Sequence, residues 1–259
     1  MVRRSKRFNL PKPLKIRNLI PVVVLVILGL GVFNWLRAFV VDSPYFKISK
    51  VEICVIGRAL LTDKTVKELL TVHKGRNIFD VDLKTTRDYI MAHYPEVRTI
   101  VINREFPNKL ILNIRPRRPI AQVSMYSGFC LVDAEGVILP GVRGLSVEGL
   151  PIIKGVDSGL VSACIGRKSN HLGLIRALRL IGIINQMRFS QGHEIHMIDV
   201  SDEKNLSFYI EGGIEIKIGG ENFRERVAML NKTFDTGRLD KSQIRYIDLR
   251  FGNVIIGPK

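Results

Sequence analysis

The closest approach to a metal-binding motif in this chain is a pair of histidines, His193 and His196, which enclose Glu194 and Ile195. A zinc H-E-x-x-H motif needs its two histidines four residues apart on one face of a helix. Here they are three apart in a segment that runs into a predicted strand, where residues three apart point to opposite faces. We therefore expect a solvated strand entry, with no metal and no cofactor.

Two carboxylates, Asp133 and Glu135, have the spacing of a candidate acid and base pair. They lie in a turn bounded by Gly136, where an aspartate usually bonds its own backbone, so turn chemistry is the better account. None of three serines weighed as nucleophiles lies in a G-x-S-x-G setting: Ser162, Ser169 and Ser190. These residues predict a protein that is not an enzyme.

The three cysteines of the chain are too few and too scattered for a disulfide framework: Cys54, Cys130 and Cys164. Cys54 and Cys130 lie in apolar sequence that is typical of strands, where a buried thiol is the simpler interpretation. The sequence leaves open whether a disulfide bond joins Cys54 and Cys130.

The best residues for binding another protein lie near the C-terminus, in a strand predicted over residues 244–251. Alternation places its side chains on two faces: Ile247, Leu249 and Phe251 on one, and Tyr246, Asp248 and Arg250 on the other. At a sheet edge, the backbone of this strand would accept a partner strand. Arg250 would then pair with a carboxylate and Phe251 would fill a pocket. The alternative is an ordinary core strand covered by its neighbours.

A weaker binding candidate is a group of three basic residues in and just after the first domain predicted below (residues 42–116): Arg104, Arg117 and Arg118. We interpret it as a recruitment surface. The alternative is a face that is simply solvated.

These candidates must be positioned outside a membrane. Leu19 to Leu36 is a run of 18 residues without an ionisable side chain, and about 20 apolar residues span a bilayer as a helix. We predict a basic tail over residues 1–18 and a transmembrane helix over residues 19–41. The tail carries seven cations and no acid, which places it in the cytoplasm and the chain from residue 42 outside. A cleaved signal peptide is the alternative.

A net charge of +16 is typical of proteins that bind nucleic acid, so this class of partner must be considered. The basic tail accounts for seven of these charges, and the other nine are spread over the remaining chain. Membrane orientation and anionic lipid explain a basic arm next to a span. We therefore expect neither a nucleic-acid partner nor a small-molecule substrate.

The outer part predicts an α+β protein with two domains. Residues 42–116 read as β-α-α-β-β, with two helices packed on one face of a three-stranded sheet. Its elements are a strand over 46–56 with a bulge near Ser49, helices capped by Thr62 and Asp82, and strands over 97–102 and 109–114.

Residues 117–259 predict a mainly antiparallel β domain with two flanking helices on one face. Its predicted strands cover 120–125, two runs within 129–139, 150–153, 195–200, 206–211, 214–218, 244–251 and 254–256. The helices cover 171–188 and 221–235, a glycine-rich loop follows residue 153, and Gly212-Gly213 marks a hairpin turn.

Four short motifs in this order resemble those of the FtsQ/DivIB cell-division proteins of bacteria. They are Asn77 to Asp82, Arg104 to Ala121, Phe129 to Gly136 and Tyr246 to Arg250. The chain departs from the family pattern in two places. Pro116-Arg117 replaces a usual Glu-Arg pair, and Ile255 and Ile256 stand where some relatives carry a tryptophan.

The resemblance implies a fold and a function. Residues 42–116 would be a POTRA domain, and the chain would be a single-pass (type II) protein of the cell inner membrane with its bulk in the periplasm, enriched at the division septum. It would be a scaffold of the divisome that links early and late division proteins and helps to control septal peptidoglycan synthesis. Its partners would be FtsB and FtsL, bound as a complex through the C-terminal strand edge and the adjoining helix, together with other divisome proteins.

Two other functional classes stay open at this point. One is a membrane-anchored periplasmic enzyme that acts on the cell wall, for which the sequence shows no catalytic pair. The other is a POTRA-containing subunit of a protein secretion or outer-membrane assembly apparatus, which would normally carry several POTRA repeats or a barrel.

Overall fold

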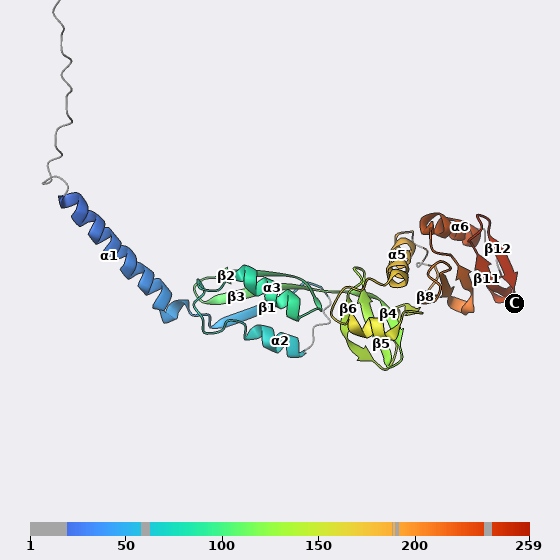
Figure 1. Cartoon of the computed structure of the whole chain (residues 1–259), viewed down its shortest axis with the longest axis horizontal. Coiled ribbons are helices and arrows are strands. Elements are labelled where there is room, and N and C mark those ends of the chain that lie inside the picture. Colours follow the sequence, from blue (N-terminus) through green and yellow to red (C-terminus); the bar gives the residue numbers. More distant parts are fainter. Residues whose placement is uncertain (1–19, 58–62, 188, 190–191, 236–239) are drawn as a thin grey trace, which may run out of the picture.

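The computed structural model describes residues 20–57, 63–187, 189, 192–235 and 240–259. The predicted basic tail and the predicted helix cap Thr62 lie outside these residues. The described part starts with a single long helix, continues into a three-stranded sheet with two helices, and ends in a nine-stranded sheet (Figure 1).

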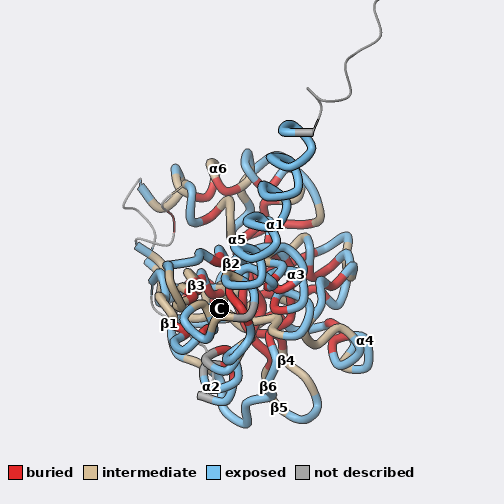
Figure 2. Tube along the Cα trace, turned by 90° about the vertical axis from the view of Figure 1, so that its left-hand side faces the viewer, coloured by how far each residue is buried: buried red, intermediate tan, exposed pale blue. Residues whose placement is uncertain are grey.

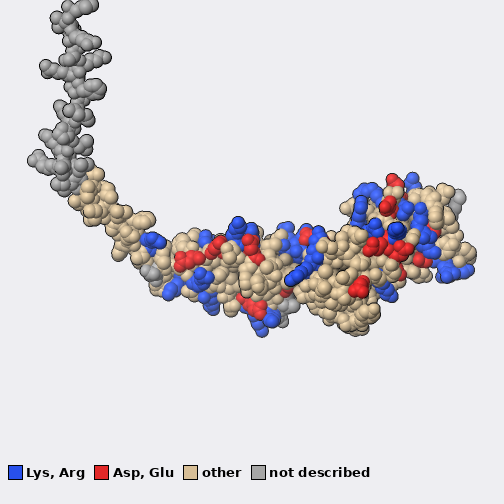
Figure 3. Space-filling model, in the orientation of Figure 1, with Lys and Arg blue, Asp and Glu red and all other residues tan. Residues whose placement is uncertain are grey.

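The first helix, α1 (Ile20–Asp42), is exposed to its surroundings along almost its whole length (Figure 2). Arg37 is the single ionisable residue between Pro21 and Val41, and the helix accordingly shows little charge (Figure 3). Pro21–Val41, 21 residues long, is apolar enough to cross a membrane, and a helix of that length rises about 30 Å. Within the described residues it is the one candidate transmembrane helix, in agreement with the prediction.

The proximal domain, residues 44–116, has the predicted β-α-α-β-β order. Its elements are η2 (Pro44–Phe46), β1 (Lys50–Val55), α2 (Asp63–Leu70), α3 (Leu83–His93), β2 (Val97–Glu105) and β3 (Lys109–Pro116). The strand order is β1-β3-β2, with β1 parallel and β2 antiparallel to β3. The predicted cap Asp82 is confirmed, since its carboxylate accepts from the backbone N–H of Lys84 and of Thr85.

One boundary in the proximal domain is wrong in the prediction. The strand expected over 46–56 begins at Lys50 and runs in unbroken register with β3, so no bulge occurs at Ser49. Before it, Ile48 exchanges backbone hydrogen bonds with the segment that precedes α3: its N–H donates to Arg76 at 2.9 Å and its carbonyl accepts from Gly75 at 2.8 Å. The contact with the sheet starts only at the next residue, where the N–H of Ser49 donates to the carbonyl of Asn108, just ahead of β3, at 2.9 Å.

The distal domain, residues 119–259, is built on the nine-stranded sheet. Its strands are β4 (Pro119–Met125), β5 (Gly128–Asp133), β6 (Ile138–Arg143), β7 (Ile152–Lys154), β8 (Ile195–Asp199), β9 (Ser207–Ile210), β10 (Glu215–Lys217), β11 (Ile244–Asp248) and β12 (Ile255–Pro258). Its helical elements are α4 (Ser158–Ala163), α5 (Leu172–Gln186), η4 (Glu211–Gly213), α6 (Phe223–Asp235) and η5 (Lys241–Gln243).

The strands follow the order β12-β11-β10-β9-β8-β7-β4-β5-β6. Neighbours are antiparallel except for three parallel pairs, β10–β11, β7–β8 and β4–β7, so the sheet is mainly antiparallel as predicted. The predicted helices α5 and α6 contact each other (Figure 1). Their apolar faces join the strands in one core, which includes Leu174, Ile181, Val227 and Leu230.

The loop expected after β7 contains a short helix that the sequence pattern did not show. The side chain of Asp157 caps α4 by accepting from the N–H of Leu160 at 2.9 Å, and Val161 is buried in the distal core. A helix of six residues is too short to display a helical period, so its cap was the available signal.

Candidate partner-binding surface

The two edges of the distal sheet are formed by β12 and β6, and not by the strand named in the prediction. In the sheet order, β11 lies between β10 and β12, so both of its backbone edges are paired. The expectation that residues 244–251 lie at the edge is therefore wrong. The final run of the chain forms the outer arm of a hairpin and covers β11.

The backbone of β12 presents polar groups away from the sheet at alternate residues. The N–H of Lys259 donates inward to the carbonyl of Gln243 at 3.0 Å. Inward and outward groups alternate along an antiparallel strand, so Gly257 and Ile255 also face β11 while the N–H and C=O of Ile256 face outward. Pro258, at the other outward position, has no N–H to present, and a proline is typical of edge strands.

Strand β11 ends at Asp248, three residues earlier than predicted, because the chain turns there. The carboxylate of Asp248 accepts from the backbone N–H of Arg250 at 3.0 Å, a local bond that competes with the ladder. It also accepts from the guanidinium Nε at 3.0 Å and from Nη2 at 2.7 Å. This contact with Arg250 lowers the pKa of the buried Asp248 carboxyl.

Arg250 and Phe251 lie in this turn, beside the edge strand. The Nη1 of Arg250 donates to Oδ1 of Asn205 at 3.1 Å, so much of the guanidinium is held within the domain. Phe251 is 68% exposed, and the Arg250 Cζ lies 5.3 Å from the centre of its ring. The structure thus brings these two predicted residues together and leaves the aromatic one available to a partner.

Tyr246 has a structural position within the same hairpin. Its ring lies against Gly257 of β12, where a Cβ would come within 2.2 Å of the ring. The Nζ of Lys217, a residue of β10, lies 4.4 Å from the centre of the Tyr246 ring. Tyr246 is therefore half-buried, and Gly257 is required for β12 to pack beside it.

A polar cluster fixes the loops that lead into this hairpin. The Glu211 carboxylate is 2.7 Å from Nδ1 of His193 and accepts from Nζ of Lys241 at 2.7 Å. The His193 ring packs against Phe234 of α6, with centroids 4.3 Å apart. Hence His193 joins an ion-pair cluster, whereas His196 is exposed on β8.

This cluster predicts an acid-dependent contribution to stability. Burial opposes ionisation of Glu211, but its contacts with Lys241 and His193 outweigh that and lower its pKa from 4.5 to about 2. A carboxyl with a depressed folded pKa stabilises the protein above its unfolded pKa, and this contribution is lost as the pH falls from about 4.5 toward 2. Urea unfolding should therefore show Glu211→Gln less stable than wild type at pH 7, with a smaller difference at pH 3. The exposed Glu194, changed to Gln, is the control, and an equal difference at both pH values would contradict the prediction.

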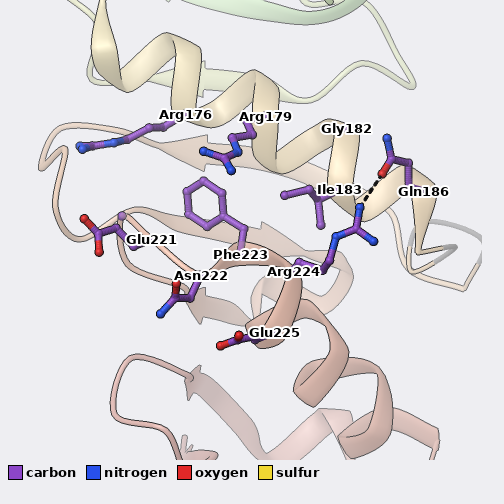
Figure 4. Close-up of a pocket in the computed structure, with 11 residues that line it drawn as sticks. Arg176, Arg179, Gly182, Ile183, Gln186, Glu221, Asn222, Phe223, Arg224 and Glu225 are labelled. Carbon is purple, nitrogen blue, oxygen red and sulfur yellow. Dashed lines mark hydrogen bonds between the residues drawn. The ribbon is translucent and has the colours of Figure 1, made fainter.

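A cleft of about 950 Å³ opens between α5 and the start of α6 (Figure 4). Its walls carry charges of both signs, and Nη2 of Arg224 donates to Oε1 of Gln186 at 3.1 Å. Among its described lining residues no serine, cysteine or histidine offers a nucleophile. The lining residues are Arg176, Arg179, Gly182, Ile183, Gln186, Gly220, Glu221, Asn222, Phe223, Arg224 and Glu225.

The three arginines of the predicted recruitment surface do not form one surface. Arg104 pairs in register with Leu110 at one end of the β2–β3 hairpin, whereas Pro116 pairs with Val97 at the other end. The six residue steps from Leu110 to Pro116 separate the two ends by about 20 Å. Arg104 is also engaged, since its Nε donates to the carbonyl of Ile78 at 2.9 Å.

Arg117 holds the two domains together. Its Nη1 donates to Oδ2 of Asp133 at 2.6 Å and to Oε2 of Glu135 at 2.7 Å, and its Nε donates to the carbonyl of Pro95 at 3.0 Å. The turn that carries both acids is confirmed, because Oδ1 of Asp133 accepts from the backbone N–H of Glu135 and of Val137. Arg118 lines an open cleft of about 430 Å³ at the junction.

The thiols contribute no cross-link to this arrangement. Cys54, Cys130 and Cys164 are all free, Cys130 is buried, and Cys54 is half-buried. Burial raises the pKa of Cys130, as expected for an inert core thiol.

Comparison with known proteins matches both domains to described families. Residues 46–117 match the POTRA domain, FtsQ-type, and residues 121–250 match Cell division protein FtsQ/DivIB, C-terminal. Cell division protein FtsQ of Syntrophotalea carbinolica is 23% identical over 83% of this chain and 74% of its own length. The Koribacter versatilis FtsQ is 25% identical over 93% of this chain and 69% of its own length. Cell division protein DivIB of Clostridium acetobutylicum is 25% identical over 54% of this chain and 56% of its own length.

The POTRA match begins within four residues of the end of α1, and the C-terminal match covers most of the distal sheet, from β4 to β11, whereas β12 lies beyond it. The chain belongs to the FtsQ/DivIB family of bacterial cell-division proteins.

Proposed function

We propose that this protein is a non-catalytic scaffold of the divisome, which binds the FtsB–FtsL complex by adding a strand of FtsB to edge strand β12. Backbone hydrogen bonds give such an added strand its affinity, and neighbouring side chains give it specificity. The observation that supports this most directly is the outward-facing N–H and C=O of Ile256, on an edge strand that is next to the exposed Phe251.

Side chains around the edge fit this role. Ile255 and Ile256 are both exposed, and together with Phe251 they offer an apolar surface on either side of the outward backbone. Arg250 adds a cation at the end of the strand, although Asp248 already engages it. In this proposal the edge backbone supplies the register and the apolar side chains supply the contact area.

The proposed membrane arrangement places this edge outside the inner membrane. Helix α1 crosses the bilayer, the basic tail stays in the cytoplasm, and both domains lie in the periplasm at the septum. Arg118, which lines the junction cleft, is the remaining candidate for contacts that recruit other division proteins. From this position the protein would link early and late division proteins and help to control septal peptidoglycan synthesis.

Replacing Phe251 by lysine tests the proposed contact. The lysine would place a charge in the apolar centre of the interface, where charges are depleted, and should abolish co-purification of FtsB and FtsL with the full-length protein from detergent-solubilised membranes. Tyr126, 99% exposed in the β4–β5 turn, is the matched control, since Tyr126→Lys should leave capture unchanged. Wild-type capture by Phe251→Lys would refute this role of Phe251.

Cells depleted of the protein should form filaments or enlarged undivided cells, and normal septation would count against the scaffold.

A further inference from the structure

Four aromatic rings form a continuous row at the end of the proximal domain that adjoins α1. The ring centroids of Tyr45 and Phe46, of Phe46 and Phe79, and of Phe79 and Phe106 are each 5.3 Å apart. The rings come from three segments: the turn after α1, the link between α2 and α3, and the turn between β2 and β3. This convergence makes the aromatic row (Tyr45, Phe46, Phe79 and Phe106) a product of the tertiary fold.

Three members of the row are open to the surroundings. Tyr45 is 64% exposed, Phe79 is 43% exposed and Phe106 is 58% exposed, while Phe46 packs partly against the proximal core. Single exposed apolar residues are ordinary, but a contiguous apolar patch marks a contact with a protein, a ligand or a membrane.

The row is anchored directly to the end of α1. The side-chain amide of Asn77 donates to the carbonyl of Val40 at 2.8 Å and to that of Val41 at 2.7 Å, and its Oδ1 accepts from the N–H of Phe79 at 2.8 Å. The last carbonyls of a helix have no partner within the helix. A buried residue of the proximal domain therefore caps the apolar helix and positions a ring of the row.

A membrane span formed by α1 would bring these rings close to the membrane interface. The apolar segment Pro21–Val41 has the length of a hydrocarbon core, so its C-terminal end lies at the level of the lipid headgroups. Trp35 and Phe39 stack on its last turns with centroids 6.1 Å apart. Aromatic rings are favoured at this interface because one side meets acyl chains and the other meets water.

We propose that the aromatic row docks on the lipid bilayer, at the headgroup and upper acyl level of the leaflet from which the proximal domain emerges. Tyr45, Phe79 and Phe106 enter the interface, and the charged neighbours Lys47, Asp80 and Glu105 stay in water. The domain is thereby held against the membrane as well as tethered to it. This inference rests on α1 crossing the bilayer, which is part of the proposed function.

The test uses tryptophan fluorescence in the full-length protein, reconstituted into phosphatidylcholine liposomes with brominated acyl chains. Trp35 is the one tryptophan of the chain, so Trp35→Phe gives a silent background. Phe106→Trp in this background reports on the row, and Tyr126→Trp in the distal domain is its control. We expect the tryptophan at position 106 to lose as large a fraction of its emission as Trp35 does in the parent protein, and the one at position 126 to lose none.

The outcomes separate this inference from the one on which it rests. Quenching of Trp35 without quenching at position 106 would overturn the docking and leave the span intact. No quenching of Trp35 would show that α1 is not in the bilayer, and the docking would fail with it. Equal quenching at positions 106 and 126 would also overturn the docking. So would a tryptophan at position 106 whose emission changes only when FtsB and FtsL are added, since the row would then be a protein contact.

Discussion

Replacing Ile256 by proline is expected to weaken binding of the FtsB–FtsL complex by at least about tenfold, which corresponds to about 1.4 kcal/mol. Proline removes the outward N–H of β12, and its ring occupies the space of the incoming strand. The inward bonds of β12 are left in place, because they belong to residues 255, 257 and 259. Binding of the purified FtsB–FtsL complex to the detergent-solubilised full-length protein, measured as a dissociation constant, gives the readout.

Two further variants make this result specific for the backbone. Ile256→Thr keeps the N–H and the β-branched shape and should lose much less affinity than the proline variant. Ile255→Pro removes a bond that faces β11 and should lower the melting temperature, which Ile256→Pro should leave close to wild type. If the proline and threonine variants of Ile256 bound equally well, strand addition at β12 would be wrong.

The sequence predicted most of the fold because its elements carry local signals. The alternation of Leu110, Leu112 and Ile114 and the cap at Asp82 specify β3 and α3 without knowledge of the tertiary structure. Gly212 and Gly213 both adopt positive φ angles, as the hairpin between β9 and β10 requires. What the local pattern could not give was α4, whose six residues are fewer than two helical turns.

The candidate site was predicted less well because edge and centre are properties of the whole sheet. Residues 244–248 alternate in the same way whether or not β12 covers them. The end of β11 depends on a hydrogen bond that the side chain of Asp248 accepts from the backbone N–H of Arg250, which alternation does not reveal. Pro258 was the local signal for the edge.

The arginine cluster failed for a related reason. Arg104 and Arg117 were grouped by residue type, but the hairpin places them at opposite ends. Arg104 donates to a carbonyl of the link between α2 and α3, whereas Arg117 donates to a carbonyl and a carboxylate at the domain junction. Long cations in a sequence give no indication of which are already paired. The junction contact of Arg117 suggests a structural role, and its loss has a large expected effect.

Arg117→Met is expected to lower the free energy of unfolding of the full-length protein by roughly 3 kcal/mol, the lower end for breaking a buried ion pair. The side chains of Arg117 and Asp133 are only 15% and 4% exposed. Without the guanidinium, Asp133 keeps the two backbone N–H donors of its turn but loses its counter-charge. Urea unfolding of the detergent-solubilised protein, followed by far-ultraviolet circular dichroism, measures the change.

Glu135→Gln is the matched variant on the other side of the same contact. Arg117 and Arg98 lower the pKa of Glu135, so it is ionised at neutral pH, and its side chain is 43% exposed. Exposed ion pairs contribute at most about 1 kcal/mol, and the amide oxygen of glutamine still accepts a hydrogen bond. The ratio of the two effects is therefore informative: a loss in Glu135→Gln as large as in Arg117→Met would mean that the exposed pair, and not the buried Asp133, joins the POTRA domain to the distal sheet.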